Sequence, residues 1–170
     1  MTIAPRYRSR FLQVRELRYH LAEWGAEDAP LVVCLHGWMD AGTNFQFLVD
    51  ALDLPVRFVA ADWRGHGRSE WAHSGVYNYV DYLGDLGFLL DALSPGRPAV
   101  IVGHSVGGNI AGLYAGVRPD RVKAVAIVDG FGLWSGDPAR ADGYLRGWLD
   151  DLHREGSRRV YPTLDGIVER

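Results

Sequence analysis

The chain has 170 residues, enough for one domain with a sizeable core, and its 48% hydrophobic and 23% charged residues are typical of a soluble globular protein. The formal net charge is -3 and no run of Lys or Arg forms a basic tract, which excludes the basic surface that nucleic-acid-binding proteins usually carry. No apolar stretch is long enough to span a bilayer and no apolar segment follows the basic N-terminus, so we expect a cytoplasmic protein with neither membrane nor nucleic-acid partners.

Cysteine and histidine content give no support for a metal site. Cys34 is the only cysteine, which excludes an internal disulfide, and we interpret it as a small buried hydrophobic residue in a strand. The six His residues include no pair with HxxxH or HExxH spacing. We therefore expect no bound metal.

The elements expected along the chain begin with a hairpin and then change to buried strands. The segment Arg10–Trp24 is rich in β-forming residues and is broken near Arg15, as in an antiparallel hairpin. Short continuous apolar runs, typical of strands buried on both faces, follow at Leu31–Leu35, Val56–Ala61, Ala99–Val102 and Val122–Val128.

Segments with helical spacing separate these buried strands. Apolar residues recur at threes and fours from Phe45 to Leu52 and again from Tyr79 to Leu93, where Asn78 is a suitable N-cap. A third segment, Ser105–Arg118, is rich in small residues and ends before Pro119. Strands that alternate with helices predict an α/β fold, with a mostly parallel sheet and helices on both of its faces.

The alternation stops after Asp129. The segment Gly130–Asp142 is loop-like, and Leu145–Leu152 is one more amphipathic helix with no buried strand after it. We therefore expect the sheet to be truncated after its sixth strand. Residues 1–132 would form the N-terminal part of a core domain, and residues 133–170 would form the start of a helical cap.

The strongest chemical signal is the run Gly103-His104-Ser105-Val106-Gly107, which matches G-x-S-x-G between a predicted strand and a predicted helix. A serine at the tip of such a tight turn has a strained backbone, and glycines two residues away on either side avoid collisions with neighbouring elements. The helix N-terminus lies beneath any oxyanion formed at the serine. A phosphate-binding loop fits less well, because no Lys follows the last glycine.

Two further segments follow the first two buried strands. They are His36-Gly37-Trp38 and Asp62-Trp63-Arg64-Gly65-His66-Gly67-Arg68-Ser69. With the G-x-S-x-G turn, they make the chain resemble the α/β-hydrolase superfamily, above all its serine-hydrolase-like, MhpC-type members, from about Phe11 to about Leu133. The resemblance implies an α/β-hydrolase fold, of which this chain would be the N-terminal portion.

The resemblance also implies roles for individual residues. Ser105 would be the catalytic nucleophile, and the backbone N–H groups of Val106 and Trp38 would form the oxyanion hole. His36 and the segment Asp62–Ser69 would shape the loops around the pocket through structural hydrogen bonds, without an acid or base role.

The acid and base of the family triad are not matched in the same way. The family order places an acid after a later strand and a His after the last strand, and this sequence has neither strand. Asp129, at the end of a buried strand, is a candidate acid, although a loop carboxylate that caps the turn is the preferred interpretation. His153 is the only His after Ser105, but it lies beside the apolar stripe of a helix, where a solvated His is the better interpretation.

The sequence therefore predicts a serine hydrolase that acts on an ester-type small-molecule substrate (a carboxylic ester, a thioester or a related carbonyl) through an acyl-enzyme, with no cofactor. A serine nucleophile argues against epoxide hydrolases and dehalogenases, which resemble this fold but have Asp at the elbow. Two alternatives stay open: a non-catalytic ligand-binding module, and one half of a split enzyme. The run Val122–Val128 would be an exposed sheet edge, through which we expect self-association.

Overall fold

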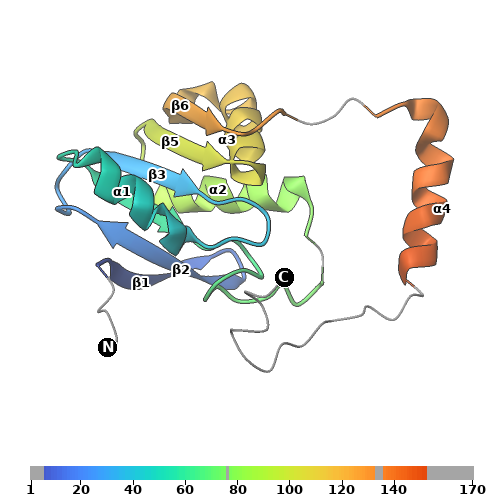
Figure 1. Ribbon diagram of the computed structural model, residues 1–170, viewed down its shortest axis with the longest axis horizontal. Coiled ribbons are helices and arrows are strands. Elements are labelled where there is room, and N and C mark those ends of the chain that lie inside the picture. The colour runs from blue at the N-terminus through green and yellow to red at the C-terminus, as the bar shows by residue number, and fades with distance from the viewer. Residues whose placement is uncertain (1–5, 76, 133–135, 153–170) are drawn as a thin grey trace. The chain divides into compact units, whose positions relative to one another are not determined.

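The computed structural model describes residues 6–75, 77–132 and 136–152, and the chain divides into two compact units (Figure 1). The second unit, Trp134–Arg170, contains α4 (Ala141–Leu152) in its described part, which confirms the helix predicted there. The division into a core over residues 1–132 and a cap over residues 133–170 stays a prediction.

The first unit, Met1–Leu133, is built on a six-stranded sheet. Its strands are β1 (Arg8–Val14), β2 (Leu17–Trp24), β3 (Leu31–Leu35), β4 (Arg57–Ala61), β5 (Ala99–His104) and β6 (Val122–Val128). The spatial order is β1-β2-β4-β3-β5-β6. Strand β2 pairs in antiparallel orientation with β1 on one side and with β4 on the other. Strands β4, β3, β5 and β6 run parallel to one another. The mostly parallel sheet predicted from the sequence is confirmed.

The N-terminal hairpin begins two residues earlier than the sequence predicts. Arg8 and Ser9 pair with Glu23 and Ala22, so polar residues extend β1 where no apolar pattern announces a strand. The chain reverses between Val14 and Leu17, and Arg15 takes a left-handed φ of 51° at this turn.

Helices cover both faces of the sheet, as predicted. The helices are α1 (Gln46–Leu52), which follows a 3-10 turn at Gly42–Phe45, α2 (Tyr79–Leu93) and α3 (Val106–Val117). Figure 1 shows α1 and α2 on opposite faces. Successive side chains of a strand point to opposite faces of the sheet. Val33 therefore packs with buried residues of α2 and α3, whereas Cys34 packs on the other face with Phe45, which lies just before α1. Burial raises the pKa of the Cys34 thiol to about 12, in agreement with its predicted packing role.

Helix α2 is fixed at its start by a cap and in its middle by a buried ion pair. The Asn78 side chain accepts a hydrogen bond of 3.0 Å from the backbone N–H of Asp81, which confirms the predicted N-cap. Farther along, Asp85 accepts bonds of 2.6 Å and 2.7 Å from the Arg64 guanidinium and another from the hydroxyl of Tyr19. These three buried side chains join α2 to β2 and to the loop after β4.

None of the helices in the described ranges is both long and apolar enough to cross a membrane.

Candidate active site

The elbow serine has the strained backbone that the G-x-S-x-G pattern predicts. Strand β5 ends at His104, α3 begins at Val106, and Ser105 between them has φ 52° and ψ -118°. Such a positive φ costs a residue with a Cβ of order 1–3 kcal/mol and persists only where the surroundings enforce it. Here the Ser105 N–H donates a 2.8 Å bond to the Val128 carbonyl, and the Ser105 carbonyl accepts a 3.0 Å bond from the Asn109 N–H.

The two glycines of the motif allow strand and helix to approach closely. A Cβ on Gly103 would lie 2.4 Å from the Gly107 carbonyl oxygen. A Cβ on Gly107 would lie 2.2 Å from the Leu35 carbonyl oxygen. Both distances are far below van der Waals contact with backbone atoms, so any larger residue would push the elbow away from β3 or from its own helix.

The loop after β3 lies directly against the elbow. A Cβ on Gly37 would be only 3.1 Å from Ser105 Cβ, which places the backbone of this loop beside the nucleophile. The Val106 N–H is the first of α3 and has no intrahelical acceptor. No described residue accepts a hydrogen bond from the Trp38 N–H. The two N–H groups assigned to the oxyanion hole are therefore without acceptors on the described part of the chain.

His36 connects this loop to the one after β4. The Trp63 backbone N–H donates to His36 Nε2 at 2.9 Å, so the ring proton is on Nδ1 and is donated to the Gly37 carbonyl at 2.7 Å. The Trp63 indole N–H returns a 3.1 Å bond to the His36 carbonyl. Burial lowers the pKa of His36, which favours this neutral form. The ring is a structural clamp, consistent with the role implied by the family resemblance.

Asp62 holds three segments together at the same edge of the sheet. Its Oδ1 accepts a 2.7 Å bond from the Gly42 N–H, and its Oδ2 accepts a 2.9 Å bond from the Arg68 N–H. The same Oδ2 accepts a 2.8 Å bond from His20 Nδ1. The sequence interpretation did not include His20, because nothing in a hairpin strand indicates which residue will face the end of β4.

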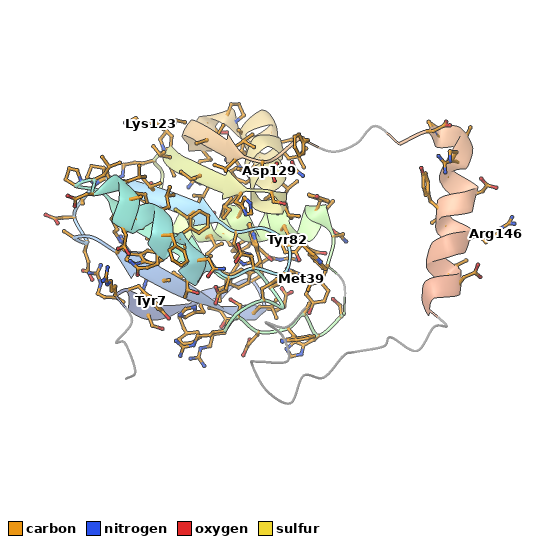
Figure 2. The ribbon with its side chains drawn as sticks, viewed as in Figure 1. Tyr7, Met39, Tyr82, Lys123, Asp129 and Arg146 are labelled. Carbon is orange, nitrogen blue, oxygen red and sulfur yellow. The ribbon has the colours of Figure 1, made fainter. Side chains whose placement is uncertain are left out.

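The candidate acid lies next to the elbow through the backbone. Asp129 follows β6 with a left-handed φ of 54°, and its neighbour Val128 is the acceptor for the Ser105 N–H (Figure 2). The Asp129 side chain is exposed, and no bonded partner for it lies in the described ranges. His153 falls outside the described residues. None of the described histidines is hydrogen-bonded to Ser105.

Two hollows lie around these loops. One, of about 490 Å³, is lined by the exposed side chains of Trp38, Met39 and Trp71 together with His66 and Tyr77. The other, of about 420 Å³, is lined by apolar residues of α1, β5 and β6 together with Asp40, Asn44 and His104. In the part of the chain that the structure describes, no group of three or more His, Cys, Asp and Glu side chains could hold a metal ion.

Comparison with known proteins places the chain in a family. The family model for the alpha/beta hydrolase fold matches residues 30–159. A serine hydrolase-like protein of Danio rerio is 39% identical over 154 residues, which cover 86% of this chain and 47% of that protein. The lipase LipV of Mycobacterium tuberculosis is 35% identical over 111 residues, covering 65% of this chain and 41% of the lipase. The chain thus spans about half or less of the length of these relatives.

Solved structures agree with the sequence relatives. A thioesterase domain from the curacin biosynthetic pathway matches with a TM-score of 0.82 and 27% identity, over 96% of this chain and 60% of the domain. A hypothetical protein of Pseudomonas aeruginosa matches with a TM-score of 0.83 and 28% identity, over 95% of this chain and 57% of that protein. The matched family model, the sheet and its elbow serine agree, and this chain belongs to the α/β-hydrolase fold family.

Proposed function

We propose that this chain supplies the nucleophile and the oxyanion hole of a serine hydrolase that acts on an ester-type small-molecule substrate through an acyl-enzyme. The observation that carries the proposal is the conformation of Ser105, which has φ 52° at a strand-to-helix turn and backbone atoms of Gly37 packed against its Cβ. Strain of this kind is typical of a nucleophile held in place for reaction.

The proposed reaction starts with attack of Ser105 Oγ on the carbonyl carbon of the ester. The hydroxyl proton passes to a base, and the carbonyl oxygen becomes an oxyanion between the N–H groups of Val106 and Trp38. The bond to the alcohol or thiol then breaks, and that group leaves with the proton. Water attacks the acyl-serine in a second step and releases the acid.

The base is the part of this reaction that the described residues do not supply. A serine hydroxyl needs a base within hydrogen-bond reach, and none of the described histidines bonds to Ser105. We propose Asp129 as the acid that orients such a base, because it follows the strand whose Val128 carbonyl binds the elbow. The base would then approach at the carboxyl ends of β5 and β6.

The ester class rests on the relatives and on the elbow. One sequence relative is a lipase and one structural relative is a thioesterase domain, and both reactions cleave a carbonyl-to-heteroatom bond. An epoxide hydrolase also matches the fold. Epoxide hydrolases of this fold have Asp at the elbow, whereas this chain has Ser105, so the serine favours an ester substrate. Trp38, Met39 and Trp71 would accept an apolar part of the ester.

A ligand-binding module without turnover is the second candidate. It is favoured by the finding that no histidine in the described ranges bonds to Ser105. The two functions differ in the reactivity of the serine. Acylation or phosphonylation requires an oriented Oγ beside an oxyanion hole, whereas a binding module needs neither. In proteases that lose triad members, the oxyanion hole and substrate binding alone still leave a rate advantage over water on the order of 10³–10⁴. A formed oxyanion hole beside Ser105 should therefore support slow covalent labelling even without the base.

The test is covalent labelling with an alkyl fluorophosphonate, followed by peptide mapping. We expect slow labelling of Ser105 that is absent in Ser105→Ala and unchanged in Ser74→Ala, which alters an exposed serine far along the chain from the elbow. Labelling of Ser105 no faster than of Ser74 would favour the ligand-binding module.

A further inference from the structure

A second set of Ser, His and Asp side chains lies outside the elbow. The Ser9 hydroxyl and His20 Nε2 are 2.9 Å apart, and His20 Nδ1 and Asp62 Oδ2 are 2.8 Å apart. These are the two hydrogen bonds that link nucleophile to base and base to orienting acid in serine hydrolases. None of the three residues contributes to the reaction proposed for Ser105.

The sheet order brings these three residues together. Ser9 lies in β1, His20 in β2, and Asp62 directly after β4, and these strands are neighbours in the sheet. His20 pairs with Phe11, so Ser9 is the diagonal neighbour of His20 on the same face. The three side chains therefore form a line across adjacent strands of the sheet.

The hydrogen bonds indicate which ring nitrogen of His20 carries the proton. A carboxylate only accepts, so His20 Nδ1 carries the proton that is donated to Asp62. The Nε2 lone pair then faces the Ser9 hydroxyl, which is the orientation that a general base needs. Both His20 and Asp62 are buried, and backbone bonds from Gly42 and Arg68 hold the carboxylate in place.

Ser9 differs from its two partners because it is exposed. Arg68 Nη1 donates a 3.1 Å bond to Ser9 Oγ, so a cationic donor lies beside the oxygen that would attack a carbonyl. The guanidinium groups of Arg18 and Arg68 both lie over the Phe11 ring, at 3.9 Å and 5.5 Å from its centroid. An exposed hydroxyl is thus placed between a buried base and a cationic, partly apolar surface.

We propose that Ser9 is a second nucleophilic site, which accepts the acyl group of activated aryl esters. Ser9 Oγ bonds to the carbonyl carbon while its proton passes to His20 Nε2, and the oxyanion lies against the Arg68 guanidinium. The bond from that carbon to the aryl oxygen then breaks. The aryloxide takes the proton from His20 and leaves as a phenol, and the acyl group remains as an ester on Ser9. This reaction does not depend on Ser105.

The experiment uses the full chain carrying Ser105→Ala, with p-nitrophenyl acetate as the acyl donor. Acetylation of each serine is followed by peptide mapping over time, with the exposed Ser74 as the internal control. General-base assistance contributes about 10²–10⁴-fold, so we expect Ser9 to react at least about 10²-fold faster than Ser74. Ser9→Ala should remove this fast site and leave acetylation of Ser74 unchanged.

Two variants distinguish a Ser9 activated by His20 from a Ser9 hydroxyl that only gives the buried His20 ring a hydrogen-bond partner. His20→Gln removes the base, and we expect it to slow acetylation of Ser9 by about 10²-fold or more. Arg68→Gln changes an exposed residue and keeps His20, so it tests the proposal even if His20→Gln fails to fold. We expect it to slow acetylation of Ser9 by about 10²-fold, as for the loss of an oxyanion donor. Equal rates at Ser9 and Ser74, or a Ser9 rate that survives Arg68→Gln, would overturn the proposal.

Discussion

The backbone N–H of Ser105 donates a 2.8 Å hydrogen bond to the carbonyl oxygen of Val128, which ties the elbow to the end of β6. The loop that follows is tied back in turn, because Asn109 Oδ1 in α3 accepts a 2.8 Å bond from the Gly132 N–H. Hydrogen bonds therefore link the end of β6 to the elbow and the following loop to α3. Asp129 lies in the chain between these two linked positions, Val128 and Gly132.

The close approach at Gly107 predicts a large effect of a single methyl group. Gly107→Ala puts a Cβ 2.2 Å from the Leu35 carbonyl oxygen, and we expect a loss of about 1–3 kcal/mol in the free energy of unfolding. The matched control is Gly116→Ala in the same helix, where the added Cβ meets nothing within 4 Å. That variant should be stabilised by up to about 1 kcal/mol, since Ala favours helix. Urea unfolding of both variants measures the difference, and equal midpoints would contradict the packing described here.

The buried pair of Arg64 and Asp85 predicts a second stability effect. The side chains of Arg64 and Asp85 are 2% and 0% exposed, and Arg64→Met removes both short bonds to the buried carboxylate. Asp85 then keeps only a 3.4 Å bond from the Arg15 guanidinium and the bond from the Tyr19 hydroxyl. Loss of one partner of a buried pair costs about 3–5 kcal/mol when the other charge is left uncompensated, and Arg15 still faces Asp85 here. We therefore expect a loss of up to about 3 kcal/mol in thermal or urea unfolding. Arg118→Met breaks an exposed pair with Asp120 and serves as the control, which should unfold at nearly the wild-type midpoint. A similar small effect in both variants would show that Asp85 finds other partners.

His36 gives the fold a pH dependence of known sign. Burial lowers the pKa of His36 in the folded chain, so the unfolded chain, with a pKa of about 6.5, binds the proton first as the pH falls. The stability associated with the neutral ring is fully present above that pH and is lost progressively below it. His36→Gln should lose stability at pH 8 and flatten the fall in urea midpoint between pH 8 and pH 5. An unchanged fall in the variant would assign the pH dependence to other groups.

Local sequence patterns were sufficient to predict most strands of the sheet and the elbow at Ser105. The run Leu31–Leu35 is bounded by Pro30 and His36, and the strand has the same limits. Asn78 marks the start of α2 because a cap is a local interaction. The bonds of Asp85 to Arg64 and Tyr19, and of His20 to Asp62, could not be predicted in this way, since they join residues 21 to 66 positions apart in the chain. Such contacts depend on the order of strands in the sheet, which places β4 between β2 and β3.

The outer strand predicts self-association. In the described ranges β6 pairs with β5 alone, and Val125, Ile127 and Val128 are 39–52% exposed. An apolar strand with free backbone groups is a template for pairing with another chain, so we expect dimers or larger species. Val125→Lys should shift sedimentation velocity profiles toward monomer, whereas Val80→Lys on the exposed side of α2 should not. A wild-type chain that stays monomeric across a dilution series up to high micromolar concentration would contradict this expectation.

The most direct test of the proposed function is the acyl-enzyme itself. After reaction with p-nitrophenyl acetate and an acid quench, peptide mapping should find acetyl on the peptide that contains Ser105, and turnover in solution should be slow because deacylation also needs a base. Ser105→Ala keeps the Cβ beside Gly37 and removes only the hydroxyl, so we expect this variant to bind ester but to carry no acetyl on that peptide. We predict acetyl-Ser105 that accumulates with time in the wild-type chain. An acid-quenched sample without acetyl on Ser105, from a folded chain that still hydrolyses the ester, would contradict it.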